Sequence, residues 1–422
     1  MRIAIFTLGT RGDVQPYVAL SKHAISKGHS AIICTGNSFK EFILEEGIEF
    51  QETASDLMAM LETEEGQKVF NHAMKQPFKT KKFVDDVVNP AFRKTLDQFW
   101  QGAQGADVIV FHPKAFGAPD IAKALGIPCI HLPPVPTAYP IEEFPNLVLS
   151  ATGNFGKTIN KWTYTIMKQA ESASIKEVND FREKTLHLPK RKTGLYTFEV
   201  DGERIPIIYP LSPALFEDVT SWQGHVELPG FFFLESEEKL DSELEAFIKV
   251  GPAPIIISFG SMALKDPEVF KKNLLAALEK SANRAVILTG NTGMTFESND
   301  QIFATKGVPH LQLFPLGKGI IHHGGVGTMA AALRSGKPQL IIPFGVDQPF
   351  WAKRLFERGY SLQPIKEKDI TIDGLVERMN DMEADRLKKR VEEISRMIKE
   401  ENGLDKAVAY IEKVVEKSCN GA

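Results

Sequence analysis

The residues with the most evident chemistry lie in a glycine-rich stretch, 322–328, whose sequence is His-His-Gly-Gly-Val-Gly-Thr. It follows the apolar pair 320–321 and precedes a stretch, 329–334, with helical character. A junction between a strand and a helix presents unpaired backbone N–H groups and the positive end of a helix dipole, which attract phosphate. Glycines let a ligand approach the backbone, and His323 and Thr328 can donate hydrogen bonds. The stretch therefore predicts a site for a phosphate-bearing ligand.

An Asp-Gln pair follows the next apolar run, 339–343. In a parallel sheet the loops after neighbouring strands open at the same edge, where ligands bind. The Asp347 carboxylate can accept hydrogen bonds from vicinal hydroxyls, and the Gln348 amide can both donate and accept, a combination that suits a hexose. A simpler interpretation is that Asp347 caps a helix that begins near Pro349.

Two other interpretations of the glycine stretch stay open at this point. It can be a tight turn with a structural histidine. Gly325-x-Gly327-x-x-Ala330 also matches a dinucleotide fingerprint weakly, but the acidic residue expected about twenty positions later is missing unless Asp347 serves.

Strands alternate with helical stretches along both halves of the chain, which indicates α/β domains with parallel sheets covered on both faces. At 422 residues the chain is too long for one ordinary core. We expect an N-terminal domain at 1–235, a linker at 236–253, and a C-terminal domain at 254–400. A C-terminal helix at 401–422 is expected to pack back on the N-terminal domain. The expected strands are 2–8, 31–34, 107–111 and 129–132 in the first half, and 254–261, 285–289, 320–321 and 339–343 in the second.

The composition limits the class of protein. Fifty basic residues against 54 acidic ones give no strong field of one sign, so nucleic acid is not an expected partner. The first residues, 2–8, lack the features of a signal peptide, and nowhere do eighteen apolar residues run together. Three cysteines are too widely spaced for a metal or disulfide pattern. We expect a cytoplasmic protein.

The motif at 323–328, with Asp347-Gln348, resembles the donor-site signature of UDP-sugar-dependent glycosyltransferases with the GT-B fold. The stretch 9–16, Gly-Thr-Arg-Gly-Asp-Val-Gln-Pro, is similar to the branch that contains sterol 3-beta-glucosyltransferases and the glycopeptide and macrolide antibiotic glycosyltransferases. Further similar stretches are 211–214, 228–234, 258–262, 308–310 and 343–351. The resemblance spans nearly the whole chain and implies two Rossmann-like, doubly wound domains that face each other across a cleft. It also implies that the domain at 1–235 binds the acceptor and the domain at 254–400 binds the nucleotide sugar.

The resemblance also implies roles for individual residues. Asp13 occupies the position of the catalytic base. The implied donor-binding residues are Gly12, Ser261, Val308, His323, Gly325, Gly327, Thr328, Asp347 and Gln348. Val308 would meet the uracil through its backbone. The branch does not require a relay partner behind Asp13.

The chemistry of the implied reaction is consistent with these roles. A hydroxyl is a poor nucleophile, so a carboxylate such as Asp13 would remove its proton during attack on the anomeric carbon. Helix-end N–H groups and His323 can stabilise the leaving diphosphate, and no Asp-x-Asp pair indicates a metal. We expect an inverting, metal-independent transfer of glucose from UDP-glucose, without a cofactor, to give a β-glycoside. A helix-capping role is the alternative for Asp13.

The acceptor is expected to be a hydrophobic alcohol: a sterol, polyketide, flavonoid or lipid. Tyr139 and Phe144 lie in an aromatic stretch that can line an apolar cavity, and His112 follows a strand at its carboxyl end. A lipid acceptor would imply transient contact with a membrane surface. The alternatives are a transferase of dTDP-deoxysugars to antibiotic aglycones and, in other classes, an NAD(P)-dependent oxidoreductase or a nucleotide-sugar epimerase.

Overall fold

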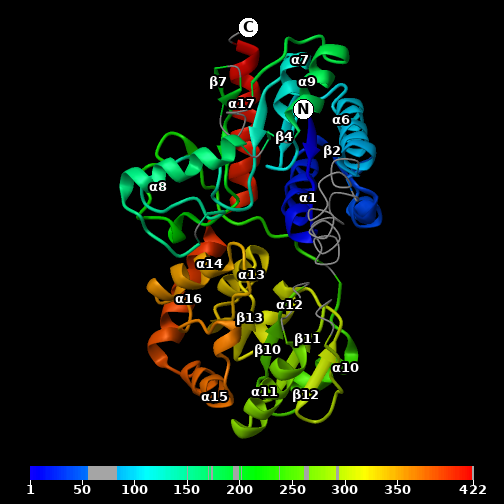
Figure 1. Ribbon diagram of the computed structural model, residues 1–422. Helices are drawn as coiled ribbons and strands as arrows, with labels where there is room; N and C mark the ends of the chain where they lie inside the picture. The colour runs from blue at the N-terminus through cyan, green and yellow to red at the C-terminus, as the bar shows by residue number, and fades with distance from the viewer. Residues whose placement is uncertain are drawn as a thin grey trace.

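The computed structural model describes residues 1–55, 83–149, 151–169, 171–172, 174–192, 199–200, 202–236, 238–260, 266–290 and 294–420. Two parallel sheets, each flanked by helices, occupy the two halves of the molecule (Figure 1). The α/β class and the doubly wound parallel sheets predicted from the sequence are confirmed. None of the helices in the described ranges is long and apolar enough to cross a membrane.

The N-terminal half is built on a seven-stranded sheet with the order β3-β2-β1-β4-β5-β8-β9 and parallel pairing throughout. Its strands are β1 (Arg2–Phe6), β2 (Ser30–Gly36), β3 (Glu49–Thr53), β4 (Val108–Phe111), β5 (Cys129–His131), β8 (Ile207–Ile208) and β9 (Val226–Glu227). Its helices are α1 (Arg11–Ser26), α2 (Lys40–Glu45), α6 (Asn89–Gly102), α7 (Ala118–Leu125), α8 (Lys157–Thr163) and α9 (Ile175–Lys184). A separate hairpin pairs β6 (Glu199–Val200) with β7 (Glu203–Arg204). The chain reverses direction across the sheet between β1 and β4, which is where such sheets bind ligands.

The C-terminal half has a five-stranded parallel sheet with the order β12-β11-β10-β13-β14. Its strands are β10 (Ile255–Ser258), β11 (Ala285–Leu288), β12 (Ile302–Thr305), β13 (Gly319–His322) and β14 (Gln339–Ile341). Its helices are α10 (Ser242–Lys249), α11 (Pro267–Lys280), α12 (His310–Leu313), α13 (Val326–Ser335), α14 (Gln348–Glu357), α15 (Ile372–Asp381) and α16 (Asp385–Glu400). Helix α10 lies inside the stretch expected to be a linker, and its Leu244 packs in the core under this sheet.

Two structural links join the halves. One apolar cluster takes residues from both, including Trp222 from the first and Trp351 from the second. Arg354 of α14 donates from Nε to the carbonyl of Leu215 at 2.7 Å. The last helix, α17 (Gly403–Asn420), returns to the N-terminal half, where its apolar residues join the cluster under α1 (Figure 1).

The apolar periodicity of the sequence from Tyr17 to Ser26 predicts a helix there, but α1 begins six residues earlier, at Arg11. Thr10 is its N-cap residue, and its backbone N–H donates to Asp13, which closes the first turn. Pro16 lies within this helix and has no N–H to donate to the carbonyl of Gly12. The helix is thus fixed at its first turn, where Asp13 lies.

Candidate active site

Asp13 lies at the carboxyl edge of the seven-stranded sheet. Its Oδ2 accepts hydrogen bonds from the backbone N–H of Thr10 at 2.7 Å and from the Thr10 hydroxyl at 3.1 Å. Gly9 has a φ of +132°, and a Cβ there would come within 2.2 Å of the same oxygen, so this close approach requires glycine. The capping alternative for Asp13 therefore holds in part, since the carboxylate helps to close the first turn of α1.

His112, which the sequence placed at the carboxyl end of a strand, lies against Asp13. Its Nδ1 accepts from the backbone N–H of Lys114 at 3.1 Å, so in the neutral ring Nε2 carries the proton. Nε2 is 3.2 Å from Asp13 Oδ1, and the Lys114 ammonium is 3.7 Å from Oδ2. His112 can therefore orient Asp13, a relation that the family resemblance did not require.

The surroundings of Asp13 favour its charged form. Burial opposes the charge, but the hydrogen bond from His112, the charge of Lys114 and the Thr10 N–H hold the pKa of the Asp13 carboxyl well below its usual range. Asp13 is thus ionised at neutral pH. It is a weak base with these donors in place, but Oδ1 accepts from His112 alone among the contacts described, so an acceptor hydroxyl can donate to its other lone pair.

The glycine stretch connects β13 to α13, as the sequence predicted. Gly324 has a φ of +93°, and a Cβ there would lie 2.8 Å from Ile341. A Cβ on Gly325 would lie 2.5 Å from His323 Nε2, so both glycines allow contacts that a side chain would prevent. Gly325 is the N-cap residue and has no side chain with which to cap α13. The first N–H groups of this helix, up to Thr328, have no partner within it.

The two adjacent histidines differ in their partners. His322 is fully buried, with Nε2 2.8 Å from Gln339 Oε1 and Nδ1 accepting from the Gly324 N–H at 3.1 Å. His323 is also buried, but its Nδ1 has no hydrogen bond within the described part of the chain. Burial lowers the pKa of His323 to about 4, against a hydrogen bond with the Ser258 backbone, so the ring is neutral at pH 7. His322 is structural, and His323 is the one able to contact a ligand.

Asp347 and Gln348 follow β14 at the start of α14. Asp347 does not cap this helix with its side chain, and instead its Oδ2 accepts from the indole N–H of Trp351 at 2.6 Å. Gln348 Oε1 accepts from the backbone N–H groups of Phe344 at 2.8 Å and Gly345 at 3.3 Å. The Gln348 side chain therefore has its NH₂ group to offer a ligand, rather than both of its polar atoms as the sequence suggested.

A small cavity of about 220 Å³ lies at the carboxyl ends of β10 and β11. It is lined by Ser258, Gly260, Leu288, Gly290, Lys306, Gly307, Val308 and His310. A Cβ on Gly290 would lie 2.2 Å from the carbonyl oxygen of Gly260, so glycine is needed where these two loops meet. Val308, predicted from the sequence, is part of this lining.

Charges in the first turn of α1 affect titratable groups of the C-terminal half. The charge of Asp13 contributes to raising the pKa of Asp347, after the larger effect of burial. In the same way, the charge of Arg11 contributes to lowering the pKa of His310 to about 4, after burial and the effect of His323. The first turn of α1 therefore lies within electrostatic reach of the carboxyl edge of the second sheet.

Comparison with known proteins decides the family. Residues 3–131 match the glycosyltransferase family 28 N-terminal domain, and residues 281–406 match the erythromycin biosynthesis protein CIII-like C-terminal domain. A sterol 3-beta-glucosyltransferase of Arabidopsis thaliana is 32% identical over 417 residues, which cover 97% of this chain and 64% of that protein. The chain belongs to the GT-B glycosyltransferases, in the branch of the sterol and antibiotic enzymes.

Other relatives agree with this assignment. A sterol 3-beta-glucosyltransferase of Candida albicans is 30% identical, over 99% of this chain and 28% of that protein. The chain thus spans less than two thirds of the length of these two relatives. Among solved structures, the glycotransferase of kitacinnamycin has a TM-score of 0.72 at 17% identity and covers 98% of this chain and 99% of its own. The spinosyn forosaminyltransferase SpnP has a TM-score of 0.68 at 16% identity, with 99% of each chain covered. These two structures show the GT-B fold.

The other predicted residues of this GT-B glycosyltransferase lie in different surroundings. Gly12 lies next to Asp13 in the first turn of α1, and Ser261 lies outside the described residues. The ring of Tyr139 stacks on His225 with centroids 4.8 Å apart. Phe144 packs against Phe350 in the cluster that joins the halves, so we do not include it in the proposed acceptor site.

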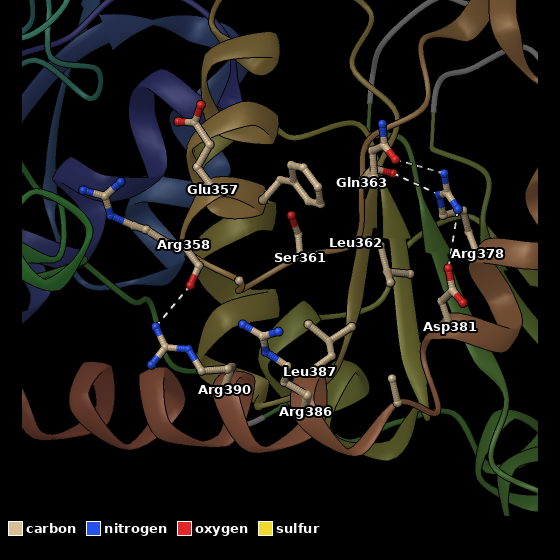
Figure 2. Close-up of a pocket in the computed structure, with 13 residues that line it drawn as sticks. Glu357, Arg358, Ser361, Leu362, Gln363, Arg378, Asp381, Arg386, Leu387 and Arg390 are labelled. Carbon is tan, nitrogen blue, oxygen red and sulfur yellow. Dashed lines mark hydrogen bonds and ion pairs between the residues drawn. The ribbon is translucent and has the colours of Figure 1, made fainter.

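A larger cavity, of about 800 Å³, lies elsewhere in the C-terminal half, between the end of α14 and the start of α16 (Figure 2). Arg358, Arg378, Arg386 and Arg390 are part of its lining, and none of the predicted site residues belongs to it. It is therefore separate from the candidate active site.

Proposed function

We propose that this chain transfers glucose from UDP-glucose to the hydroxyl of a hydrophobic acceptor, with a sterol as the first candidate. The names of its relatives, which are sterol 3-beta-glucosyltransferases, support the acceptor class and the sugar. One observation carries the proposal. The Asp13 carboxylate of the N-terminal half lies within electrostatic reach of Asp347 in the C-terminal half, which also holds the glycine stretch.

The C-terminal half would hold the donor. The uracil lies in the small cavity beside Val308, and the diphosphate meets the first N–H groups of α13 and the His323 ring. The glucose hydroxyls donate to Asp347 and accept from the Gln348 NH₂ group. In this proposal the N–H groups and His323 stabilise the charge that develops on the leaving diphosphate, a task for which no metal is needed.

The N-terminal half would supply the base. The acceptor oxygen forms a bond to the anomeric carbon while the bond from that carbon to the phosphate oxygen breaks, and the hydroxyl proton passes to Asp13. One displacement inverts the anomeric centre, so an α-linked donor gives a β-glycoside. His112 acts as a positioning residue, since it touches Asp13 and holds the carboxylate in one orientation.

The test is to incubate the protein with UDP-glucose or dTDP-glucose, with sterols, flavonoids and macrolides as acceptors, in the presence of EDTA. We expect a monoglucosylated sterol by mass spectrometry, with UDP-glucose preferred. Product only with the dTDP donor and a macrolide would favour the antibiotic type of transferase. Consumption of donor without acceptor would favour an epimerase. No product with any acceptor, together with no thermal stabilisation by UDP, would sink the proposal.

A further inference from the structure

Helix α8 and the turn after it expose their apolar side to solvent. Six large apolar residues line this surface, which we call the apolar stripe: Val148, Leu149, Phe155, Ile159, Trp162 and Ile166. Ile159 and Trp162 are three residues apart on α8 and share one face of it, while Phe155 lies just before this helix and Ile166 in the 3₁₀ turn 164–169 after it. Trp162 is 66% exposed. The stripe holds six of the thirteen large apolar side chains that are exposed among the described residues, so it is a concentrated patch.

The opposite face of α8 is polar and buried, which reverses the usual arrangement of a surface helix. Asn160 accepts from the backbone N–H of Phe155 at 3.0 Å and donates to the carbonyl of Glu142 at 2.9 Å. The Thr163 hydroxyl accepts from the backbone N–H of Asn146 at 2.8 Å. These hydrogen bonds fix the helix to the protein and hold the apolar stripe outward. The exposure is thus built into the local structure.

Within the segment that carries the apolar stripe, 144–170, all the charged residues are lysines. No acidic residue occurs between Glu143 and Glu171, whereas Lys157 and Lys161 lie on α8 itself. Both lysines are exposed, and Lys161 is 3.8 Å from Glu142 in a solvent-exposed ion pair. Aromatic and aliphatic side chains on one face with lysines beside them are typical of helices that lie in a membrane interface.

We propose that the apolar stripe docks this enzyme on the surface of an anionic lipid bilayer, with Trp162, Ile159 and Phe155 inserted between headgroups. The lysines favour lipid over a second copy of the chain, because anionic headgroups provide the opposite charge. Tyr164, next to the stripe, packs in the same cluster against which Tyr139 rests. The purpose of docking, which is access to an acceptor held in a membrane, rests on the proposed function. The structural evidence for docking does not depend on it. Figure 1 shows α8 at the outer edge of the N-terminal half.

The test uses the full chain with vesicles of phosphatidylcholine alone or with added phosphatidylserine. We expect co-sedimentation with the phosphatidylserine vesicles. The double variant Ile159→Gln with Trp162→Gln should reduce the partition coefficient by about tenfold or more. Val269→Gln, which changes an exposed apolar residue on α11, is the matched control and should bind like the unmodified chain.

A spectroscopic measurement locates the contact. Insertion should shift the tryptophan emission to shorter wavelength, and Trp162→Phe should remove that shift while vesicle binding persists. Absence of binding by the unmodified chain, equal binding by the double variant, or a dimer in light scattering that the double variant dissolves would overturn the inference.

An activity measurement separates this inference from the proposed function. Transfer to a sterol dissolved with cyclodextrin should be unchanged in the double variant. Failure of that reaction in the unmodified chain would count against the proposed function alone, and absence of vesicle binding by the unmodified chain, with transfer intact, would count against docking alone.

Discussion

Asp13 and Asp347 are carboxylates on opposite halves of one site, and their surroundings act on them in opposite directions. Burial disfavours the charge on both. The donors and charges around Asp13, which come from His112, Lys114 and the Thr10 N–H, outweigh the effect of burial, so the pKa of Asp13 is lowered. The hydrogen bond from the indole N–H of Trp351 to Asp347 does not outweigh the effect of burial, so the pKa of Asp347 is raised.

The difference shows which half still has hydrogen-bonding groups available for a ligand. The carboxylate of the N-terminal half is supplied with donors by the protein and keeps its charge without a ligand. In the C-terminal half, Asp347 and the buried Nδ1 of His323 still have hydrogen bonds to make. A sugar nucleotide would complete that half, since its hydroxyls can donate to Asp347 and its phosphates can accept from His323. Carboxylates whose pKa values are driven apart commonly have different roles in one reaction.

The largest effect is expected from Asp13→Asn. The amide can still accept from Thr10 but cannot take a proton, so kcat should fall by about 10³-fold. UDP affinity, measured by calorimetry, should stay within about twofold, because Asp13 does not touch the donor diphosphate in this account. Asp347→Asn is the matched control and should weaken the use of UDP-glucose more than the binding of UDP. A fully active Asp13→Asn enzyme would restrict Asp13 to the helix turn.

The next effect is expected from Gly327→Ala in the first turn of α13. An added Cβ there meets nothing within 4 Å, and alanine favours helix, so the free protein should be at least as stable. The methyl group would occupy the space proposed for the diphosphate, and UDP affinity should fall by roughly tenfold or more. Thermal unfolding with and without UDP measures both quantities. If UDP stabilised the Gly327→Ala variant as much as the unmodified chain, the diphosphate would not bind at the first turn of α13.

His112→Gln should have a smaller effect on rate and a diagnostic effect on pH dependence. Removing His112 takes away a hydrogen bond that lowers the pKa of Asp13, so this pKa should rise. The acid limb of the kcat/KM profile should therefore move to higher pH, with kcat reduced by about tenfold. A merely structural histidine would lower the rate at every pH without moving the limb.

The last prediction concerns acid stability rather than activity. Burial lowers the pKa of His322 to about 3 and of His323 to about 4, below the ordinary value of 6.5. The unfolded chain then binds more protons than the folded one as the pH falls from 6.5 toward 4, so stability decreases over that range. Each histidine should contribute about 1.4 kcal/mol per pH unit. Urea unfolding at several pH values measures this slope, and His323→Gln should reduce it. A slope that His323→Gln leaves unchanged would contradict the burial of this ring.

Much of this architecture was predictable because strands, glycine turns and helix ends leave local patterns. The alternation of apolar runs predicted both parallel sheets, and the glycines of 324–327 predicted the junction of β13 and α13. The earlier start of α1 was missed because Thr10 and Asp13 cap it in a sequence rich in glycine and containing a proline. Long-range partners left no pattern, since His112 lies ninety-nine residues from Asp13 and Leu288 of the small cavity is an ordinary strand residue. Helix α8 lies in the stretch 150–185, whose sequence predicts helix, but only the structure shows which face of α8 is buried.

The configuration of the product tests the central claim most directly. If Asp13 activates the acceptor hydroxyl on the face opposite to the diphosphate held by α13, the transfer is a single displacement. The anomeric proton of the glucoside formed from UDP-glucose should then show, by NMR, the large vicinal coupling of a β-glucoside. A small coupling, which marks an α-glucoside, would contradict the account.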